Sequence, residues 1–202
     1  MSAVVHVVDD DKLVRESLGD LLRSVGYQVA LYRSAAEFIQ VELPDIPACL
    51  VLDVRLPGSS GLELQEYLAR VNIRLPVILV TGFGDIPMSV KAMKAGAIDF
   101  LAKPIRDQDL LDAVATAIEM DRSRRHEVAR VSKVLDRYAL LTPREQQVIA
   151  LVAAGLMNKQ VAHELSISEV TVKTHRSSAM RKLGEKSVAG LARIADVLGT
   201  RG

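Results

Sequence analysis

Short apolar runs alternate with helical patterns along the first 120 residues, and this alternation limits the possible fold more than any other feature. The run from Ala48 to Leu52 is entirely apolar, which is typical of a strand buried on both faces. Further strands are expected at 4–8, 27–32, 76–80 and 98–101, with helical patterns at 13–22, 35–41, 62–71, 86–95 and from 109 onward. Because parallel strands need crossover connections, we predict an α/β doubly wound, five-stranded parallel sheet of the flavodoxin-like type.

Length and composition set the remaining bounds. A chain of 202 residues suits two small domains, each with its own core. Its one cysteine, Cys49, excludes a disulfide framework and a Cys-rich metal site. No apolar run approaches the ~20 residues needed to cross a bilayer, and no secretory leader pattern opens the sequence. We therefore expect a cytoplasmic protein without a membrane segment.

The small net charge of +1 hides an uneven distribution. Residues 1–121 carry a net charge of −7, residues 122–138 carry +4, and residues 139–202 carry +4. A polyanion partner would meet the second half of such a chain. A solvated basic surface fits the charge alone equally well.

Polar residues follow the expected strands where each one ends. They are Asp9, Asp10, Asp53, Thr81 and Lys103. Taken singly, each could be a helix cap, a turn residue or a surface charge. Ligands of doubly wound sheets bind beyond the carboxyl ends of the strands, so we expect these five residues to meet at one edge.

That combination indicates phosphoryl chemistry. Three carboxylates repel one another and are usually held by a divalent cation with oxygen ligands, for which Mg²⁺, or Mn²⁺ in its place, fits best. A hydroxyl and an ammonium group are redundant for metal binding, but they suit an arriving phosphoryl group. A carboxylate such as Asp53 can attack that group and form an acyl phosphate.

Four motifs resemble the receiver domain of two-component response regulators over residues 3 to about 121. They are Val7-Val8-Asp9-Asp10-Asp11, Leu50-Val51-Leu52-Asp53-Val54-Arg55-Leu56-Pro57-Gly58, Val80-Thr81-Gly82-Phe83-Gly84-Asp85-Ile86-Pro87-Met88 and Asp99-Phe100-Leu101-Ala102-Lys103-Pro104. The resemblance implies that a sensor histidine kinase phosphorylates Asp53. It also implies that Asp9, Asp10, Asp53 and the backbone carbonyl of Arg55 hold the metal ion.

The same resemblance assigns the switch. Thr81 and Lys103 sense the phosphoryl group, and Phe100 occupies the position of the switch aromatic. Lacking a hydroxyl, Phe100 can change its burial but cannot report it through a hydrogen bond. The Lys103-Pro104 bond is expected to be cis.

Residues 122–138 are expected to form a helical linker. Apolar residues keep helical spacing from Leu110 to Leu135, and no Gly or Pro occurs between Pro104 and Pro143. One long helix and a twice-interrupted helix both fit this pattern. The segment could pair with its copy in a dimer, or it could be an uncoupled spacer.

Residues 139–202 predict a small all-α, four-helix domain. Thr142, Pro143 and Glu145 form a capping-box pattern at its start. Helices are expected from there to Gly155 and at 158–165, 169–183 and 187–198. The turn at 166–168 between two helices is typical of a helix-turn-helix, whose later helix enters the DNA major groove.

The helix at 169–183 should separate an apolar face from a DNA-binding face. The apolar set is Val170, Val172, Ala179, Met180 and Leu183, and the outward basic or hydroxylic set is Lys173, Thr174, Arg176, Ser177, Arg181 and Lys182. Side chains of the second set contact phosphates and base edges. The segment resembles the DNA-binding domain of the LuxR and FixJ type, in which Lys173, Thr174 and Ser177 match the base-reading positions.

We therefore interpret the chain as a FixJ-type response regulator. Phosphorylation of Asp53 would promote a homodimer that binds double-stranded DNA and acts on RNA polymerase. The chain would not be an enzyme beyond slow phosphorylation and dephosphorylation of itself. A phosphatase or phosphotransferase with Asp53 as nucleophile is the rival from another class, and a constitutive DNA-binding protein with a vestigial receiver is a third reading.

Overall fold

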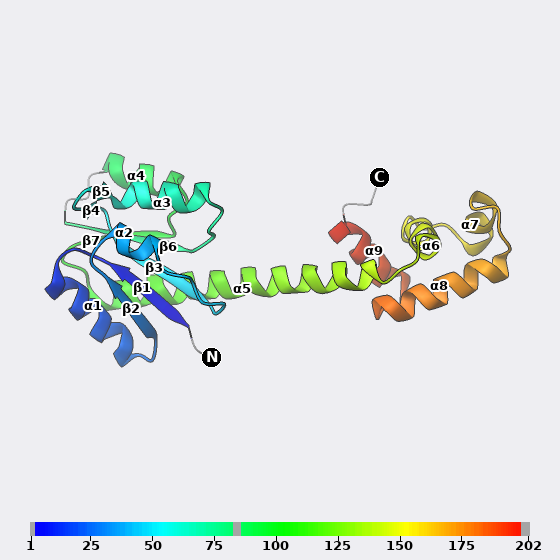
Figure 1. Cartoon of the computed structure of the whole chain (residues 1–202), viewed down its shortest axis with the longest axis horizontal. Coiled ribbons are helices and arrows are strands. Elements are labelled where there is room, and N and C mark those ends of the chain that lie inside the picture. The colour runs from blue at the N-terminus through cyan, green and yellow to red at the C-terminus, as the bar shows by residue number, and fades with distance from the viewer. Residues whose placement is uncertain (1–2, 83–85, 199–202) are drawn as a thin grey trace. The chain divides into compact units, whose positions relative to one another are not determined.

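The computed structural model describes residues 3–82 and 86–198 and confirms the doubly wound parallel sheet (Figure 1). The strand order is β2-β1-β3-β6-β7, and every neighbouring pair is parallel. The strands are β1 Val4–Val8, β2 Gln28–Tyr32, β3 Ala48–Asp53, β6 Val77–Thr81 and β7 Asp99–Ala102. Each bound lies within one residue of the expectation.

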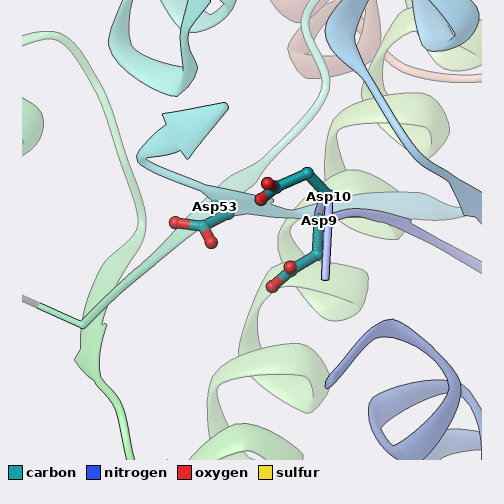
Figure 2. Close-up of side chains that lie close together, drawn as sticks. All are labelled: Asp9, Asp10 and Asp53. Carbon is teal, nitrogen blue, oxygen red and sulfur yellow. The ribbon is translucent and has the colours of Figure 1, made fainter. Parts of the chain in front are cut away.

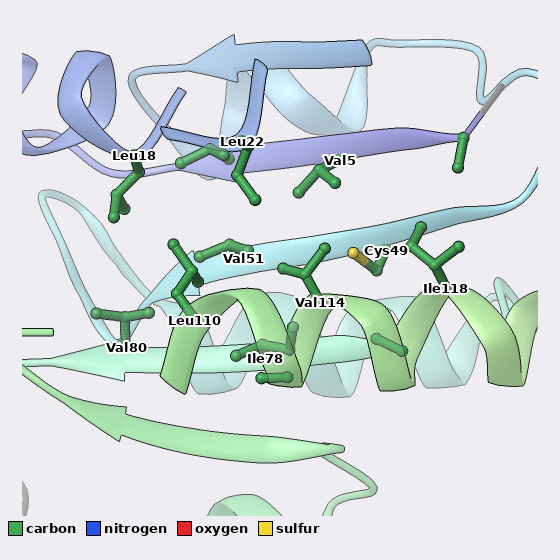
Figure 3. Close-up of a cluster of buried hydrophobic side chains, with 14 residues drawn as sticks. Val5, Leu18, Leu22, Cys49, Val51, Ile78, Val80, Leu110, Val114 and Ile118 are labelled. Carbon is green, nitrogen blue, oxygen red and sulfur yellow. The ribbon is translucent and has the colours of Figure 1, made fainter. Parts of the chain in front are cut away.

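Helices cover both faces of this sheet, because side chains alternate along each strand. The helices of this part are α1 Lys12–Ser24, α2 Ala35–Ile39, α3 Gly61–Arg70, α4 Ile86–Lys94 and α5 Asp107–Ala139. On β3, Cys49 and Val51 face the core under α1 and α5 (Figure 3). Leu50 and Leu52 face the opposite core, which α2, α3 and α4 cover. The sheet is therefore buried on both sides, as the apolar strand sequences predict.

A two-stranded hairpin lies between β3 and α3. It pairs β4 Arg55–Leu56 with β5 Ser59–Ser60. Gly58 turns the chain with φ of 82°, a conformation that favours glycine. Ser60 then begins α3 with a capping box to Glu63.

Helix α5 is continuous over 33 residues, so the interrupted alternative for the linker is wrong. The chain divides into two compact units, Met1–Arg125 and His126–Gly202. Within the first unit, the buried carboxylate of Asp121 on α5 accepts a hydrogen bond of 3.0 Å from the Ala48 amide at the start of β3. Arg124 and Arg125 also donate to Asp121. This network fastens α5 to the amino end of β3.

The second unit confirms the all-α, four-helix expectation. Its helices are α6 Pro143–Ala153, α7 Asn158–Glu164, α8 Glu169–Leu183 and α9 Val188–Leu198. Thr142 caps α6 in the expected capping box with Glu145. Apolar residues of all four helices share one core, to which Val148, Val161, Leu183 and Leu191 contribute. No helix within the described part of the chain is both long and apolar enough to span a membrane.

Candidate functional site

The carboxylates of Asp9, Asp10 and Asp53 gather at the carboxyl ends of β1 and β3 (Figure 2). These strands are neighbours in register, with Val8 opposite Leu52, so the residues that follow meet at one edge. One oxygen of each carboxylate lies within 4.8 Å of the others. Asp9 and Asp53 are buried, whereas Asp10 is exposed. The sheet topology therefore brings together residues separated by more than forty positions.

Lys103 joins this cluster from the far side of the sheet. Its ammonium lies 2.7 Å from Oδ2 of Asp9 and 2.6 Å from Oδ2 of Asp53. The Lys103 amide donates to the Thr81 carbonyl at 2.7 Å, which aligns the ends of β6 and β7. The Lys103-Pro104 bond is cis, as the resemblance implies. Four of the five residues predicted from the strand ends thus lie in one cluster, and Thr81 lies on the strand between Asp53 and Lys103.

Burial and charge act against each other in this cluster. Burial raises the pKa of Asp9, because the charged form loses hydration, and the hydrogen bond from Lys103 only partly offsets this effect. Burial alone would lower the pKa of Lys103, but its hydrogen bonds to Asp53 and Asp9 outweigh that effect and raise the pKa. Lys103 therefore remains a cation, held between two acidic side chains.

Backbone groups fix the other oxygens of the two buried carboxylates. Oδ1 of Asp53 accepts from the Arg55 amide at 3.0 Å, and Oδ1 of Asp9 accepts from the Asp11 amide at 2.9 Å. Gly61 approaches the Asp53 carbonyl so closely that a Cβ would collide with it. The side chain of Asp53 is therefore held in one orientation by its own chain and by Lys103.

Arg15 is a further member of the site, which the sequence patterns do not predict. Its Nη1 donates to the Asp9 carbonyl at 2.6 Å and to the Asp10 carbonyl at 3.3 Å. These bonds brace the turn between β1 and α1. Arg15 lies one helical turn after Asp11, the N-cap of α1, and this position could have indicated that its side chain reaches back to the turn.

The residues predicted to act as the switch, Thr81 and Phe100, lie on the neighbouring strands β6 and β7. Thr81 ends β6 and is fully buried. Phe100 on β7 is half-buried against the core that α2, α3 and α4 cover. Phe83, Gly84 and Asp85 of the third motif lie outside the described residues.

Three carboxylates within 4.8 Å, those of Asp9, Asp10 and Asp53, form a hard oxygen donor set, which fits a small divalent cation.

The outward face of α8 is the second candidate site. Lys173, Thr174, Ser177 and Arg181 are exposed on it, as the sequence predicts. Val172, Ala179 and Leu183 are buried, and Met180 packs partly against the core. Val170 was expected to be buried and is 72% exposed. That expectation was wrong because its position lies half a helical turn around α8 from the core-facing residues.

Two cations predicted to point outward are instead bonded within the second unit. Arg176 donates to Oδ1 of Asn158 on α7 at 3.1 Å. The Lys182 ammonium lies 2.7 Å from the buried carboxylate of Glu145 on α6. Hydrogen bonds from Lys182 and the Thr142 amide lower the pKa of Glu145 to about 2. A buried carboxylate needs a paired cation, so Lys182 stabilises the helix packing first.

The fold and these two sites define a class of protein: a regulator that joins an acidic receiver site to a helix-turn-helix unit. Residues 5–115 match the response regulator receiver domain, and residues 139–195 match the bacterial regulatory proteins of the luxR family. The chain belongs to the transcriptional response regulators with a LuxR-type DNA-binding domain. The resemblance to FixJ-type regulators is thereby confirmed.

Relatives match along nearly the full length. Nodulation protein W of Bradyrhizobium diazoefficiens is 54% identical over 98% of this chain and 87% of its own. The transcriptional regulatory protein FixJ of Rhizobium meliloti is 41% identical over 95% of this chain and 94% of its own. The solved structure of the response regulator StyR has a TM-score of 0.88 at 46% identity, covering 97% of this chain and 99% of that chain. Full-length FixJ from B. japonicum gives a TM-score of 0.58 at 36% identity, with 98% of both chains covered.

Proposed function

We propose that Asp53 is the phosphoacceptor of this response regulator and that a sensor histidine kinase supplies the phosphoryl group. The observation that carries the proposal is the bridge of Lys103 between Asp53 and Asp9, which sets a cation where phosphoryl oxygens would arrive. An Asp53 oxygen would form the new bond to phosphorus while the bond from phosphorus to the kinase histidine nitrogen breaks. The imidazole keeps that electron pair and takes up a proton.

Each neighbouring residue has a defined part in this transfer. Lys103 would exchange its contact with the Asp53 carboxylate for a phosphoryl oxygen, and the Thr81 hydroxyl would donate to another. The Arg55 amide keeps the Asp53 side chain oriented during attack. Asp9, Asp10, Asp53 and the Arg55 carbonyl would hold Mg²⁺ or Mn²⁺, which neutralises phosphoryl charge when bound.

Phosphorylation would act on the second unit by favouring a homodimer on DNA. Two copies of α8 would then enter successive major grooves of a two-fold operator. Lys173, Thr174 and Ser177 would face base edges, and Arg181 would contact a phosphate. Arg176 and Lys182 serve the packing of α8 before any phosphate contact. Contact with RNA polymerase from the bound dimer would complete the regulation.

Intact-mass measurement of the full chain after incubation with acetyl phosphate and Mg²⁺ tests the phosphoacceptor. We expect one phosphoryl adduct in the unaltered chain and in Asp20→Asn, whose carboxylate is exposed on α1. Asp53→Asn and added chelator should both remove the adduct. A persistent adduct in Asp53→Asn would contradict the assignment. Turnover of a small phosphomonoester in more than a stoichiometric amount would indicate a hydrolase instead.

A further inference from the structure

Val170 is a large apolar side chain left in solvent at the start of α8. It is the second residue of the helix and is 72% exposed. Ser168, the N-cap, accepts from the Thr171 amide at 3.0 Å, and the two hydroxyls lie 2.8 Å apart. The first turn is therefore well fixed. A β-branched side chain on such a turn has little rotamer freedom, so Val170 presents its methyl groups in a defined direction.

Helical geometry places Val170 in the middle of the DNA-facing stripe. Successive residues turn by about 100°, so positions three, four, seven and eleven residues later lie within about 60° of Val170. These positions are Lys173, Thr174, Ser177 and Arg181. The same stripe borders an open groove of about 450 Å³, lined by Val170, Lys173, Thr174, Ser177, Ser178 and Arg181. Val170 thus shares one surface with the predicted base-reading residues.

The polar side chains of this stripe do not account for every base contact that α8 could make. The Thr174 hydroxyl donates to the Val170 carbonyl at 3.0 Å, so its proton is already used within the helix. Lone exposed apolar residues are common on protein surfaces and need no special role. Val170 differs from them because it lies at the N-terminal end of α8. The N-terminal residues of a recognition helix are the ones that meet base edges.

We propose that Val170 is a specificity-determining residue that packs against the C5-methyl group of a thymine in the major groove. That methyl is an apolar feature that thymine alone of the four standard bases displays there, and it is a suitable partner for an aliphatic side chain. The inference rests on the proposed role of α8 as the groove-reading helix. Lys173 on the next turn would read a neighbouring base by hydrogen bonding, so the two side chains together would select a short thymine-containing step.

The test uses the phosphorylated full chain and a duplex selected from a random pool by that chain. Each thymine is then replaced singly by deoxyuridine, which removes only the methyl group. We expect one replacement in each half-site to weaken binding about fourfold, the effect of one buried methyl group. In Val170→Ala, the same replacement should change affinity by less than about 1.5-fold, because its partner is gone. Alanine favours helix, so this exposed variant should remain folded.

A matched control is Val188→Ala, which truncates an exposed valine at the start of α9. It should retain the full deoxyuridine effect. Equal deoxyuridine losses in the unaltered chain and Val170→Ala at every thymine would overturn the inference while leaving α8 as the reading helix. A chain that selects no sequence from the pool would contradict the proposed function itself, and Val170 readout with it.

Discussion

The two functional regions use charge in opposite ways. The edge of the sheet buries Asp9 and Asp53 and holds Lys103 between them, whereas α8 leaves Lys173 and Arg181 in solvent. Among the described residues, the buried acidic and histidine side chains of the first unit are those of His6, Asp9, Asp53 and Asp121. In the second unit, Glu145 is the only described residue of these types that is buried. Buried charges interact strongly and shift each other's pKa values. Exposed charges keep their mobility and can meet a long polyanion.

The lysines of these two regions differ in how firmly the protein fixes their side chains. Lys103 is fixed by two carboxylates and suits a single small anion in a defined position. Lys173 has no such fixation within α8, so it can adjust to a base or a phosphate. Lys182 falls between them, since it lies on α8 but is paired with Glu145.

The largest expected effect is on the stability of the first unit. Lys103→Gln leaves Asp9 and Asp53 without their cation, so the free energy of unfolding should fall by about 3 kcal/mol. Native-state hydrogen exchange of the β3 amides would measure it. Lys12→Gln, which breaks a pair between exposed side chains at 3.7 Å, should change it by less than about 0.5 kcal/mol. Equal effects of the two variants would remove the contrast between buried and exposed lysines.

Acid should destabilise the first unit through His6. Burial lowers the pKa of His6 to about 4 from 6.5, and its Nδ1 lies 3.0 Å from the Tyr32 hydroxyl. Between these pH values the unfolded chain binds the proton more readily, so stability falls as pH drops from 6.5 toward 4. The slope should be at most about 1.4 kcal/mol per pH unit. Hydrogen exchange of the β1 amides at several pH values would measure this slope.

The control separates His6 from other acid-sensitive groups. His6→Asn should flatten the slope in this pH range, whatever its effect on stability at neutral pH. His163→Asn, which alters an exposed histidine of the second unit, should leave the slope unchanged. An unchanged slope in His6→Asn would show that other groups cause the acid sensitivity.

A smaller effect is expected from Glu145, the buried carboxylate among the described residues of the second unit. Glu145→Gln keeps an acceptor for the Thr142 amide but loses the ion pair with Lys182, which should cost about 1 kcal/mol. Because the pKa of Glu145 is lowered to about 2, its contribution is complete above pH 4.5 and is lost as pH falls toward 2. Hydrogen exchange of the α6 amides should show this acid sensitivity in the unaltered chain and not in Glu145→Gln.

The smallest effect concerns the exposed face of α8. Arg181→Gln should weaken binding to specific and random duplexes alike, and should reduce the slope of log K against log salt by about 1. Lys182→Gln should lower the stability of the second unit. It should change the salt slope less than Arg181→Gln does, because the Lys182 ammonium is already paired with Glu145. Titrations at four salt concentrations would measure both slopes. A larger slope change for Lys182→Gln than for Arg181→Gln would show that the ion pair opens on DNA.

The sequence determined the local structure and most of the chemistry. Apolar runs and helical spacing predicted every strand of the main sheet, and a capping box marked where α6 begins. The residues at the strand ends predicted the acidic site, because parallel strands must deliver their carboxyl ends to one edge. These features depend on neighbours in the sequence or on sheet topology, and both can be predicted from a sequence pattern.

Only the tertiary structure decided the partners of individual side chains. The pairing of Lys182 with Glu145 joins residues 37 positions apart, and the bond from Ala48 to Asp121 joins residues 73 positions apart. Helical spacing alone separates Val170 from Val172 and Ala179 by about half a turn, but only the packing of the other helices decides which of these two faces of α8 is covered. The packing of elements that are distant in the sequence fixes these contacts. No local sequence pattern specifies that packing.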